Sequence, residues 1–282
     1  MRKTYIIKGG LGKSIAFSAL VQKLAEKEGE KINVISAYPD IFAWSPYIDR
    51  SWSAAQFDQN PELQAAGKLI AAEPYDCEYK YDPDQHICAW WANEFDVNFD
   101  PNADLPRIAL GGKALEISET IRARIAGRSF GVVQFSGGQS PEGYNPDAHY
   151  PLTPMTLSRN YPPQIANVLM RRLRAAYPRT EWINFALSNE PDILAASKIN
   201  APYIAALELA KNAAIIVCID GALAHFAAAA GRSAVVLWNS FAWANPNKYG
   251  WHIHKNLVAP NMEHDYADAI DAVKTLYTEA NQ

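Results

Sequence analysis

Short runs of consecutive apolar residues alternate along this chain with longer stretches in which apolar residues recur every three or four positions. The first pattern is typical of buried strands, and the second is typical of amphipathic helices. We expect strands over residues 5–7, 32–36, 131–135, 182–186, 214–219 and 234–238. Helices are expected near 14–28, 114–125, 163–177 and 265–281. Strands that alternate with helices in this way predict an α/β fold with parallel sheets covered on both faces.

Two parts of the chain share one order of elements, namely strand, glycine-bearing turn, helix and strand. The turns are residues 9–12 in the first part and 136–139 in the second. This repetition predicts two Rossmann-like lobes with parallel sheets facing a central cleft. The expected division is 1–126 for the first lobe, 127–262 for the second, and 263–282 for a C-terminal helix that could cross back onto the first lobe.

The most informative stretch follows the expected strand at 214–219. Asp220 and Gly221 end that strand, Ala222 opens an alanine-rich helix, and His225 lies in its first turn. At the carboxyl end of a parallel strand, the unpaired N–H groups and the dipole of a helix N-terminus favour negative charge, so phosphorylated ligands bind there. The alternative is an ordinary strand–turn–helix unit in which Asp220 caps the helix.

Length, composition and charge narrow the class of protein. The chain has 282 residues, of which 49% are hydrophobic, so a large core and about two domains are expected. The net charge of −4 gives no general attraction to nucleic acid, although it does not exclude a local basic face. Three cysteines do not make a disulfide framework, and no Cys/His cluster has the spacing of zinc ligands. Without a signal-like N-terminus or an apolar run of membrane-spanning length, we expect a soluble, cytoplasmic protein.

The glycine-rich N-terminal turn, Lys8-Gly9-Gly10-Leu11-Gly12-Lys13-Ser14, resembles the deviant Walker A motif of ParA/MinD-type ATPases. In that motif, backbone N–H groups wrap the phosphates, a lysine contacts the terminal phosphates and the serine binds Mg²⁺. The resemblance implies a further aspartate at the end of a later strand. The strand at 131–135 instead ends in Ser136-Gly137-Gly138, so the wider sequence fits this motif poorly.

A second resemblance joins both ends of the chain. The opening strand, glycine turn and helix are similar to the start of heptosyltransferase-like glycosyltransferases of family 9, which have the GT-B fold. Ser158-Arg159-Asn160-Tyr161-Pro162 looks like that family's Ser-x-x-Lys/Arg-x-Trp-Pro motif at the start of a helix. The block Asp220-Gly221-Ala222-Leu223-Ala224-His225 is similar to its Asp-Thr/Ser-Gly-x-x-His motif. The three motifs occur in the family's order. A divergent, phage-encoded branch of the family is one form of this resemblance.

The resemblance implies that the second lobe binds a nucleotide-diphosphate sugar. Contacts to this donor are then expected from the glycine turns, the strand ends and the alanine-rich helix: Gly10, Gly12, Ser136, Gly137, Gly138, Arg159, Glu190, Asp220, Gly221, Ala222 and His225. In this set, Arg159 would neutralise the diphosphate and Glu190 would hold the ribose or base. The resemblance implies neither a metal nor a cofactor beyond the donor itself.

The sequence departs from the family at Lys13, where the family carries an aspartate that serves as the general base. A protonated lysine cannot take up a proton from the acceptor. Either the base is another residue, for which Glu73, Asp76, Asp82 and His86 are candidates, or Lys13 stabilises the leaving diphosphate. A third alternative is a binding protein with an inactive site.

Together these features predict a glycosyltransferase that moves a sugar from a nucleotide-diphosphate sugar to an acceptor hydroxyl, without a metal and with inversion. The acceptor would be a saccharide or a modified nucleotide. A hydroxylated base in phage DNA is one alternative, which the net acidity disfavours and which would place the protein in the host cytoplasm. The ParA/MinD-like ATPase is the alternative from a different class.

Overall fold

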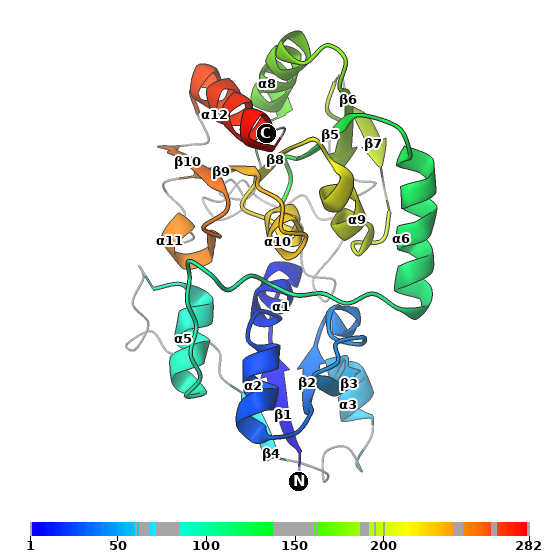
Figure 1. Ribbon diagram of the computed structural model, residues 1–282, viewed down its shortest axis with the longest axis vertical. Coiled ribbons are helices and arrows are strands. Elements are labelled where there is room, and N and C mark those ends of the chain that lie inside the picture. The colour runs from blue at the N-terminus through cyan, green and yellow to red at the C-terminus, as the bar shows by residue number, and fades with distance from the viewer. Residues whose placement is uncertain are drawn as a thin grey trace. The chain divides into compact units, whose positions relative to one another are not determined.

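The computed structural model describes residues 2–59, 61, 68–71, 85–137, 161, 163–186, 192–194, 196–199, 201–239, 245–260 and 264–280. The chain forms two compact units, of which the first runs to Ala114 and the second begins at Leu115 (Figure 1). Each unit contains its own parallel sheet. The α/β architecture with two Rossmann-like parts, expected from the sequence, is therefore confirmed.

The sheet of the first unit contains β1 (Lys3–Ile7), β2 (Ile32–Ser36), β3 (Ile48–Trp52) and β4 (Lys68–Ala71). These strands are parallel, in the order β3-β2-β1-β4. The helices are α1 (Leu11–Phe17), α2 (Val21–Glu28), α3 (Ala54–Asp58) and α5 (Ile87–Glu94), with a 3-10 turn η1 (Pro39–Ile41). The outer strands β3 and β4 were not expected from the sequence, because they are short and only partly buried, so their pattern of apolar residues is weak.

The single helix expected over residues 14–28 is divided into α1 and α2. At the break, the hydroxyl of Ser18 donates to the carbonyl of Ile15 at 2.6 Å, and the Ser18 backbone N–H donates to the same carbonyl. A serine that bonds to the preceding turn competes with the α-helical pattern and bends or ends a helix. Gly29 then ends α2 with a left-handed backbone (φ 69°), as the sequence predicts.

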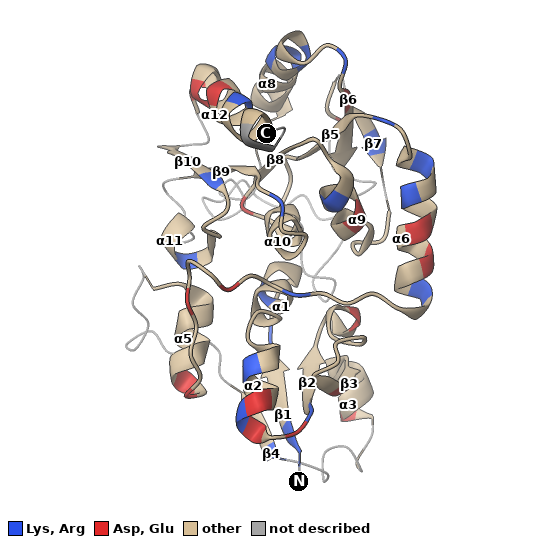
Figure 2. Ribbon diagram, in the orientation of Figure 1, with Lys and Arg blue, Asp and Glu red and all other residues tan. Residues whose placement is uncertain are grey.

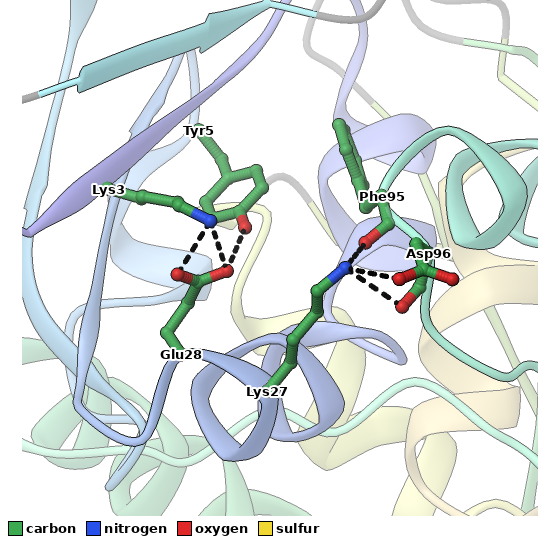
Figure 3. A network of polar contacts seen from close by, with 6 residues as sticks. All are labelled: Lys3, Tyr5, Lys27, Glu28, Phe95 and Asp96. Atoms are coloured by element: carbon green, nitrogen blue, oxygen red, sulfur yellow. Dashed lines mark hydrogen bonds and ion pairs between the residues drawn. The ribbon is translucent and has the colours of Figure 1, made fainter.

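Two lysines tie helix α2 and strand β1 to their neighbours within the first unit (Figure 3). Lys27 donates to the carbonyl oxygens of Phe95 at 2.7 Å and Asp96 at 3.0 Å, where α5 ends. A cation at this position satisfies the last carbonyls of a helix and complements its dipole. Lys3 pairs with Glu28 at 2.7 Å, and burial together with the Glu28 carboxylate raises the pKa of Tyr5.

The sheet of the second unit has six parallel strands in the order β10-β9-β8-β5-β6-β7. They are β5 (Phe130–Gln134), β6 (Glu181–Phe185), β7 (Ser197–Ile199), β8 (Ile215–Ile219), β9 (Val235–Asn239) and β10 (Lys255–Ala259). The helices of this part are α6 (Gly112–Ile125), α8 (Pro163–Ala176), α9 (Ala205–Asn212), α10 (Ala222–Ala229), α11 (Pro246–Tyr249) and α12 (Tyr266–Ala280). The central strands β5 and β8 are buried along their whole length, so they read as apolar runs.

The C-terminal helix α12 belongs to the second unit. Its residues Ala269, Ala272 and Val273 are buried in one core with Leu169 and Leu173 of α8 and with the strands of the sheet. Figure 1 shows α12 and α8 side by side against this sheet. The apolar stripe of α12 is therefore buried in the core of the second unit.

Most of helix α6 also belongs to the second unit, because a buried acid on α9 holds it there. The Glu208 carboxylate is 1% exposed and accepts from Ser118 at 2.5 Å and from Arg122 at 2.7 Å, both on α6. The side chain of Asn212 donates to the same carboxylate at 2.9 Å. The compact units consequently divide at Ala114/Leu115, and not at 126/127 where the sequence placed the division.

Residues of both charges occur along α2 and α6 (Figure 2). Charges of both signs at helical spacing are typical of solvated helix faces. Among the helices of the described ranges, none is both long and apolar enough to cross a membrane.

Candidate functional site

The carboxyl end of strand β8 leads directly into helix α10. Asp220 follows the strand and is 8% exposed, and Gly221 is the N-cap residue in a fully extended conformation (φ −168°, ψ −175°). The first N–H groups of α10 therefore lie at the carboxyl edge of the parallel sheet, where such groups lack partners within the helix. This is the strand–helix junction that the sequence predicts at residues 220–225.

A residue of the neighbouring strand satisfies one of these N–H groups. Gln134, the last residue of β5, accepts the backbone N–H of Leu223 through its side-chain Oε1 at 3.0 Å. Gly221 occupies the N-cap position, Asp220 precedes it, and Gln134 supplies the acceptor for the Leu223 N–H. A Cβ atom at Gly221 would lie 3.3 Å from the Gln134 oxygen, so the glycine lets these two strand ends approach closely.

Asp220 gives this edge a buried carboxylate. Burial raises the pKa of the neighbouring Cys218 thiol, and the charge of Asp220 raises it further. Cys218 is fully buried in β8 and is a free cysteine, so it fills the strand as a small apolar side chain. Asp220 therefore lies between the end of β8 and the beginning of α10.

The first turn of α10 is also held by the segment before β10. The indole Nε1 of Trp251 donates to Nδ1 of His225 at 2.9 Å, with the two rings edge to face. Nε2 of His254 lies 2.9 Å from the carbonyl oxygen of Ala224, and the N–H of Ala234 donates to Nδ1 of His254 at 3.3 Å. Burial lowers the pKa of His254 to about 4, so this ring is neutral at ordinary pH.

The structure describes only part of the segment that follows β5, the strand next to β8 in the sheet. Ser136 and Gly137 follow β5 and are partly buried, and the N–H of Tyr161 donates to the carbonyl of Phe135 at 2.8 Å. Gly138, Arg159 and Glu190 lie outside the described residues, so their expected contacts with a donor stay predictions.

The glycine turn of the first unit differs from a phosphate-wrapping loop. Helix α1 begins at Leu11 with Gly10 as its N-cap residue, so Gly12 and Lys13 already lie inside the helix. The Ser14 hydroxyl is fully buried and shares a hydrogen bond of 2.7 Å with the hydroxyl of Ser36. A Walker A serine must instead reach a bound Mg²⁺ ion. The Ser14 contact therefore gives the ATPase interpretation no support, and that interpretation stays an untested alternative.

Lys13 folds back over the turn that precedes its helix. Gly9 has a left-handed backbone (φ 98°), and a Cβ atom built there would lie 3.4 Å from the Lys13 Nζ. The lysine ammonium thus covers the glycine turn at the carboxyl end of β1. At this position it presents a positive charge and, while protonated, no acceptor for a proton.

Of the candidate bases, only His86 lies within the described residues, whereas Glu73, Asp76 and Asp82 lie outside them. His86 is the N-cap residue of α5, and its Nδ1 accepts the Cys88 N–H at 3.2 Å. Its ring is 7% exposed and stacks on Phe99 with 5.2 Å between centroids. These contacts give His86 a structural role at the start of α5.

Strand β8 leads into a helix N-terminus: Gly221, without a side chain, precedes α10, His225 lies in the first turn of the helix, and Gln134 accepts the N–H of Leu223. Backbone N–H groups and the helix dipole together favour negative charge at such a position. The sheet edge at a strand–helix junction is also where open α/β folds bind nucleotides.

Sequence reasoning missed three residues that shape this junction: Gln134, Trp251 and His254. Gln134 had a usable signal, since it is a polar residue at the end of a strand that is otherwise apolar. Trp251 and His254 had none, because nothing in the local pattern connects residues 251–254 with a helix that starts at 222.

Solved structures share this fold across nearly the whole chain. A glycosyl transferase of family 9 from Veillonella parvula matches with a TM-score of 0.71 and 11% identity, covering 99% of this chain and 97% of its own. The E. coli ADP-heptose lps heptosyltransferase II matches with a TM-score of 0.68 and 12% identity, and E. coli heptosyltransferase WaaC, solved with ADP, with 0.60 and 11%, each covering both chains completely. No family model matches the sequence, and no curated protein matches it significantly. At these sequence identities, the feature that the chain shares with these proteins is the fold alone.

Proposed function

We propose that this chain, which has the fold of the family 9 glycosyltransferases, is itself a glycosyltransferase that uses a nucleotide-diphosphate sugar. In the proposed reaction an acceptor hydroxyl oxygen attacks the anomeric carbon of the sugar. The bond from this carbon to the diphosphate oxygen breaks, the nucleoside diphosphate leaves with the electron pair, and a base takes the hydroxyl proton. A single displacement of this kind inverts the anomeric carbon, and the proposal requires no metal.

The observation that carries the proposal is the junction between β8 and α10. The N-terminus of α10, with Gly221 in front of it, offers backbone donors at the carboxyl edge of the sheet. We assign the diphosphate of the donor to this position, where Asp220, Ala222 and His225 would contact the phosphates or the sugar. Ser136, Gly137, Gly138, Arg159 and Glu190 would complete the donor site, and they are assigned from the resemblance to the family.

For Lys13 we propose the role of a cation that stabilises the developing charge of the leaving diphosphate. Its ammonium group covers Gly9 and the glycine turn that also contains Gly10 and Gly12. A protonated amine donates up to three hydrogen bonds and carries the charge that a leaving diphosphate needs. The general base is then a different group, and the cytoplasmic location of the protein and its acceptor stay predictions.

Binding measurements on the intact protein test the proposal most directly. ADP, UDP and GDP, and sugars linked to each, are titrated with EDTA present, and the melting temperature is recorded. A ligand at about 100 times its Kd stabilises the folded state by about 2.7 kcal/mol, which shifts the melting temperature measurably. At least one nucleoside diphosphate should stabilise the protein, and no stabilisation by any of them would contradict the proposal.

A charge placed at the helix start makes this test specific. Ala222→Glu adds a carboxylate to the first residue of α10, where the helix dipole tolerates it but a diphosphate is repelled. Ala54→Glu is the matched control, because Ala54 is the first residue of α3 in the first unit and is exposed. We expect the Ala222 variant alone to lose nucleotide binding, with both variants folded. Product analysis with the bound donor, a saccharide panel and hydroxymethylated DNA then identifies the acceptor class.

A further inference from the structure

We infer that Trp251 is a positioning residue for the donor site, which acts by setting the protonation state of His225. This inference rests on the proposed function, since it concerns how the same junction receives a diphosphate. Trp251 is 1% exposed and His225 is 5% exposed, so water does not compete freely for their hydrogen bond. The bond joins the indole Nε1 to the imidazole Nδ1 at 2.9 Å.

The chemistry of the two rings decides where the His225 proton is. An indole N–H is only a donor, so the ring nitrogen that faces it must be without a proton. His225 is therefore neutral with its proton on Nε2, because an imidazolium ion or the other tautomer would set two N–H groups against each other. Trp251 in this way keeps the proton of His225 on Nε2. From this nitrogen, His225 can donate a hydrogen bond to a phosphate oxygen.

The surroundings of Trp251 make this arrangement rigid. His254 lies three residues further along and bonds to the carbonyl of Ala224, the residue before His225. The backbone N–H of His254 donates to the Trp251 carbonyl at 2.9 Å, so both side chains belong to one tight turn. The turn at residues 251–254 therefore makes two bonds to the first turn of α10. His254 bonds to the backbone carbonyl of Ala224, and Trp251 donates to the ring of His225.

The test combines a spectroscopic readout with nucleotide binding. In protein labelled with ¹⁵N-histidine, long-range proton–nitrogen spectra distinguish protonated from unprotonated ring nitrogens, and His225→Ala assigns the signals. We expect unprotonated Nδ1 and protonated Nε2 for His225 in the native protein, and a mixture of states in Trp251→Phe. Trp238→Phe is the matched control, because Trp238 is 2% exposed and its indole also makes a 2.9 Å bond, to Asn256.

Affinity for the nucleoside diphosphate selected by the melting experiment should fall about three- to tenfold in Trp251→Phe, in line with one lost hydrogen bond. It should not change in Trp238→Phe. In the His225→Ala background, Trp251→Phe should have no further effect, because the two residues act through one bond. A purely structural role of Trp251 would instead weaken binding in both backgrounds.

Each outcome decides between the alternatives. Protonated Nδ1 or an imidazolium in the native protein would overturn the inference, and so would a Trp251→Phe variant that binds normally or whose loss persists without His225. If no nucleoside diphosphate binds the native protein although Nε2 carries the proton, the proposed function fails, and the positioning role fails with it. A wrong tautomer in a protein that does bind nucleotide would overturn the positioning role alone.

Discussion

The side-chain oxygen of Gln134 accepts the backbone N–H of Leu223 at 3.0 Å. A residue at the end of strand β5 therefore caps helix α10, which follows the neighbouring strand β8. The partners are 89 positions apart in the chain. The bond makes the direction of α10 dependent on strand β5, and the helix start cannot turn away from the sheet edge without breaking it.

Two substitutions of Gln134 should therefore separate stability from binding. Gln134→Ala leaves the Leu223 N–H without its acceptor and should destabilise the protein by about 1–2 kcal/mol. Gln134→Glu keeps an acceptor oxygen but adds a negative charge at a position that is 7% exposed, so it should lower the melting temperature and, unlike Gln134→Ala, also lower nucleotide affinity. Melting curves with and without nucleotide measure both effects. Equal affinity in the native protein and the Glu variant would remove the diphosphate from this position.

Glu208 should support stability only above strongly acidic pH. Burial alone would raise the pKa of its carboxyl, but hydrogen bonds from Arg122, Ser118 and Asn212 outweigh burial and hold the pKa at about 2. A lowered pKa means that this contribution is complete above the ordinary value of 4.5 and disappears as the pH falls from there towards 2. Glu208→Gln should cost about 1–3 kcal/mol at neutral pH. Urea unfolding at pH 7, 4 and 3 should show this difference shrinking.

His254 should destabilise the folded state in a separate, higher range of pH. Its pKa falls from 6.5 to about 4 because the ring is buried, so the unfolded chain takes up a proton at higher pH than the folded one. Stability is then lost as the pH falls from 6.5 towards 4, by up to about 3 kcal/mol at roughly 1.4 kcal/mol per pKa unit. His254→Gln, which keeps an uncharged donor, should flatten the stability profile between pH 6.5 and 4. An unchanged profile would show that His254 does not titrate in this way.

Ser14 should matter for stability and not for nucleotide binding. Ser14→Ala removes the buried hydrogen bond to Ser36 and should cost about 1 kcal/mol. Addition of Mg²⁺ should not increase the affinity for ATP in either protein, because the hydroxyl is already bonded inside the first unit. Isothermal titration with ATP, with and without Mg²⁺, provides the measurement, and an increase that depends on Ser14 would support the ATPase interpretation.

Lys13 should act through its charge and not as a base. Lys13→Met should lower kcat roughly tenfold or more, since a donor to the leaving group is lost, while Lys13→Arg should retain more of the activity. Lys13→Asp separates the two roles, because an aspartate could accept a proton but would repel the diphosphate. Turnover that rises in the aspartate variant would identify this position as that of the missing base.

The elements of the core could be read from the sequence because their signals are local. Strand β2 coincides with the expected range, and β5, β6, β8 and β9 differ from it by one residue at each end or less. Edge strands β3, β4, β7 and β10 were missed, because each is short and only partly buried, so its pattern of apolar residues is weak. The division of one helix into α1 and α2 was missed as well, since it depends on a hydroxyl that bonds to its own preceding turn.

The sequence by itself determined that this chain forms two parallel α/β units and that a glycine-led helix follows the strand ending at Ile219. Periodic apolar positions and glycines act within a few residues, so these features need no knowledge of distant partners. Only the tertiary structure decided which groups hold the helix start: Gln134 from the next strand, and Trp251 and His254 from the turn before β10. The register of the parallel strands and the packing around α10 bring these side chains to the start of the helix. The spacing of residues along the chain does not predict these contacts.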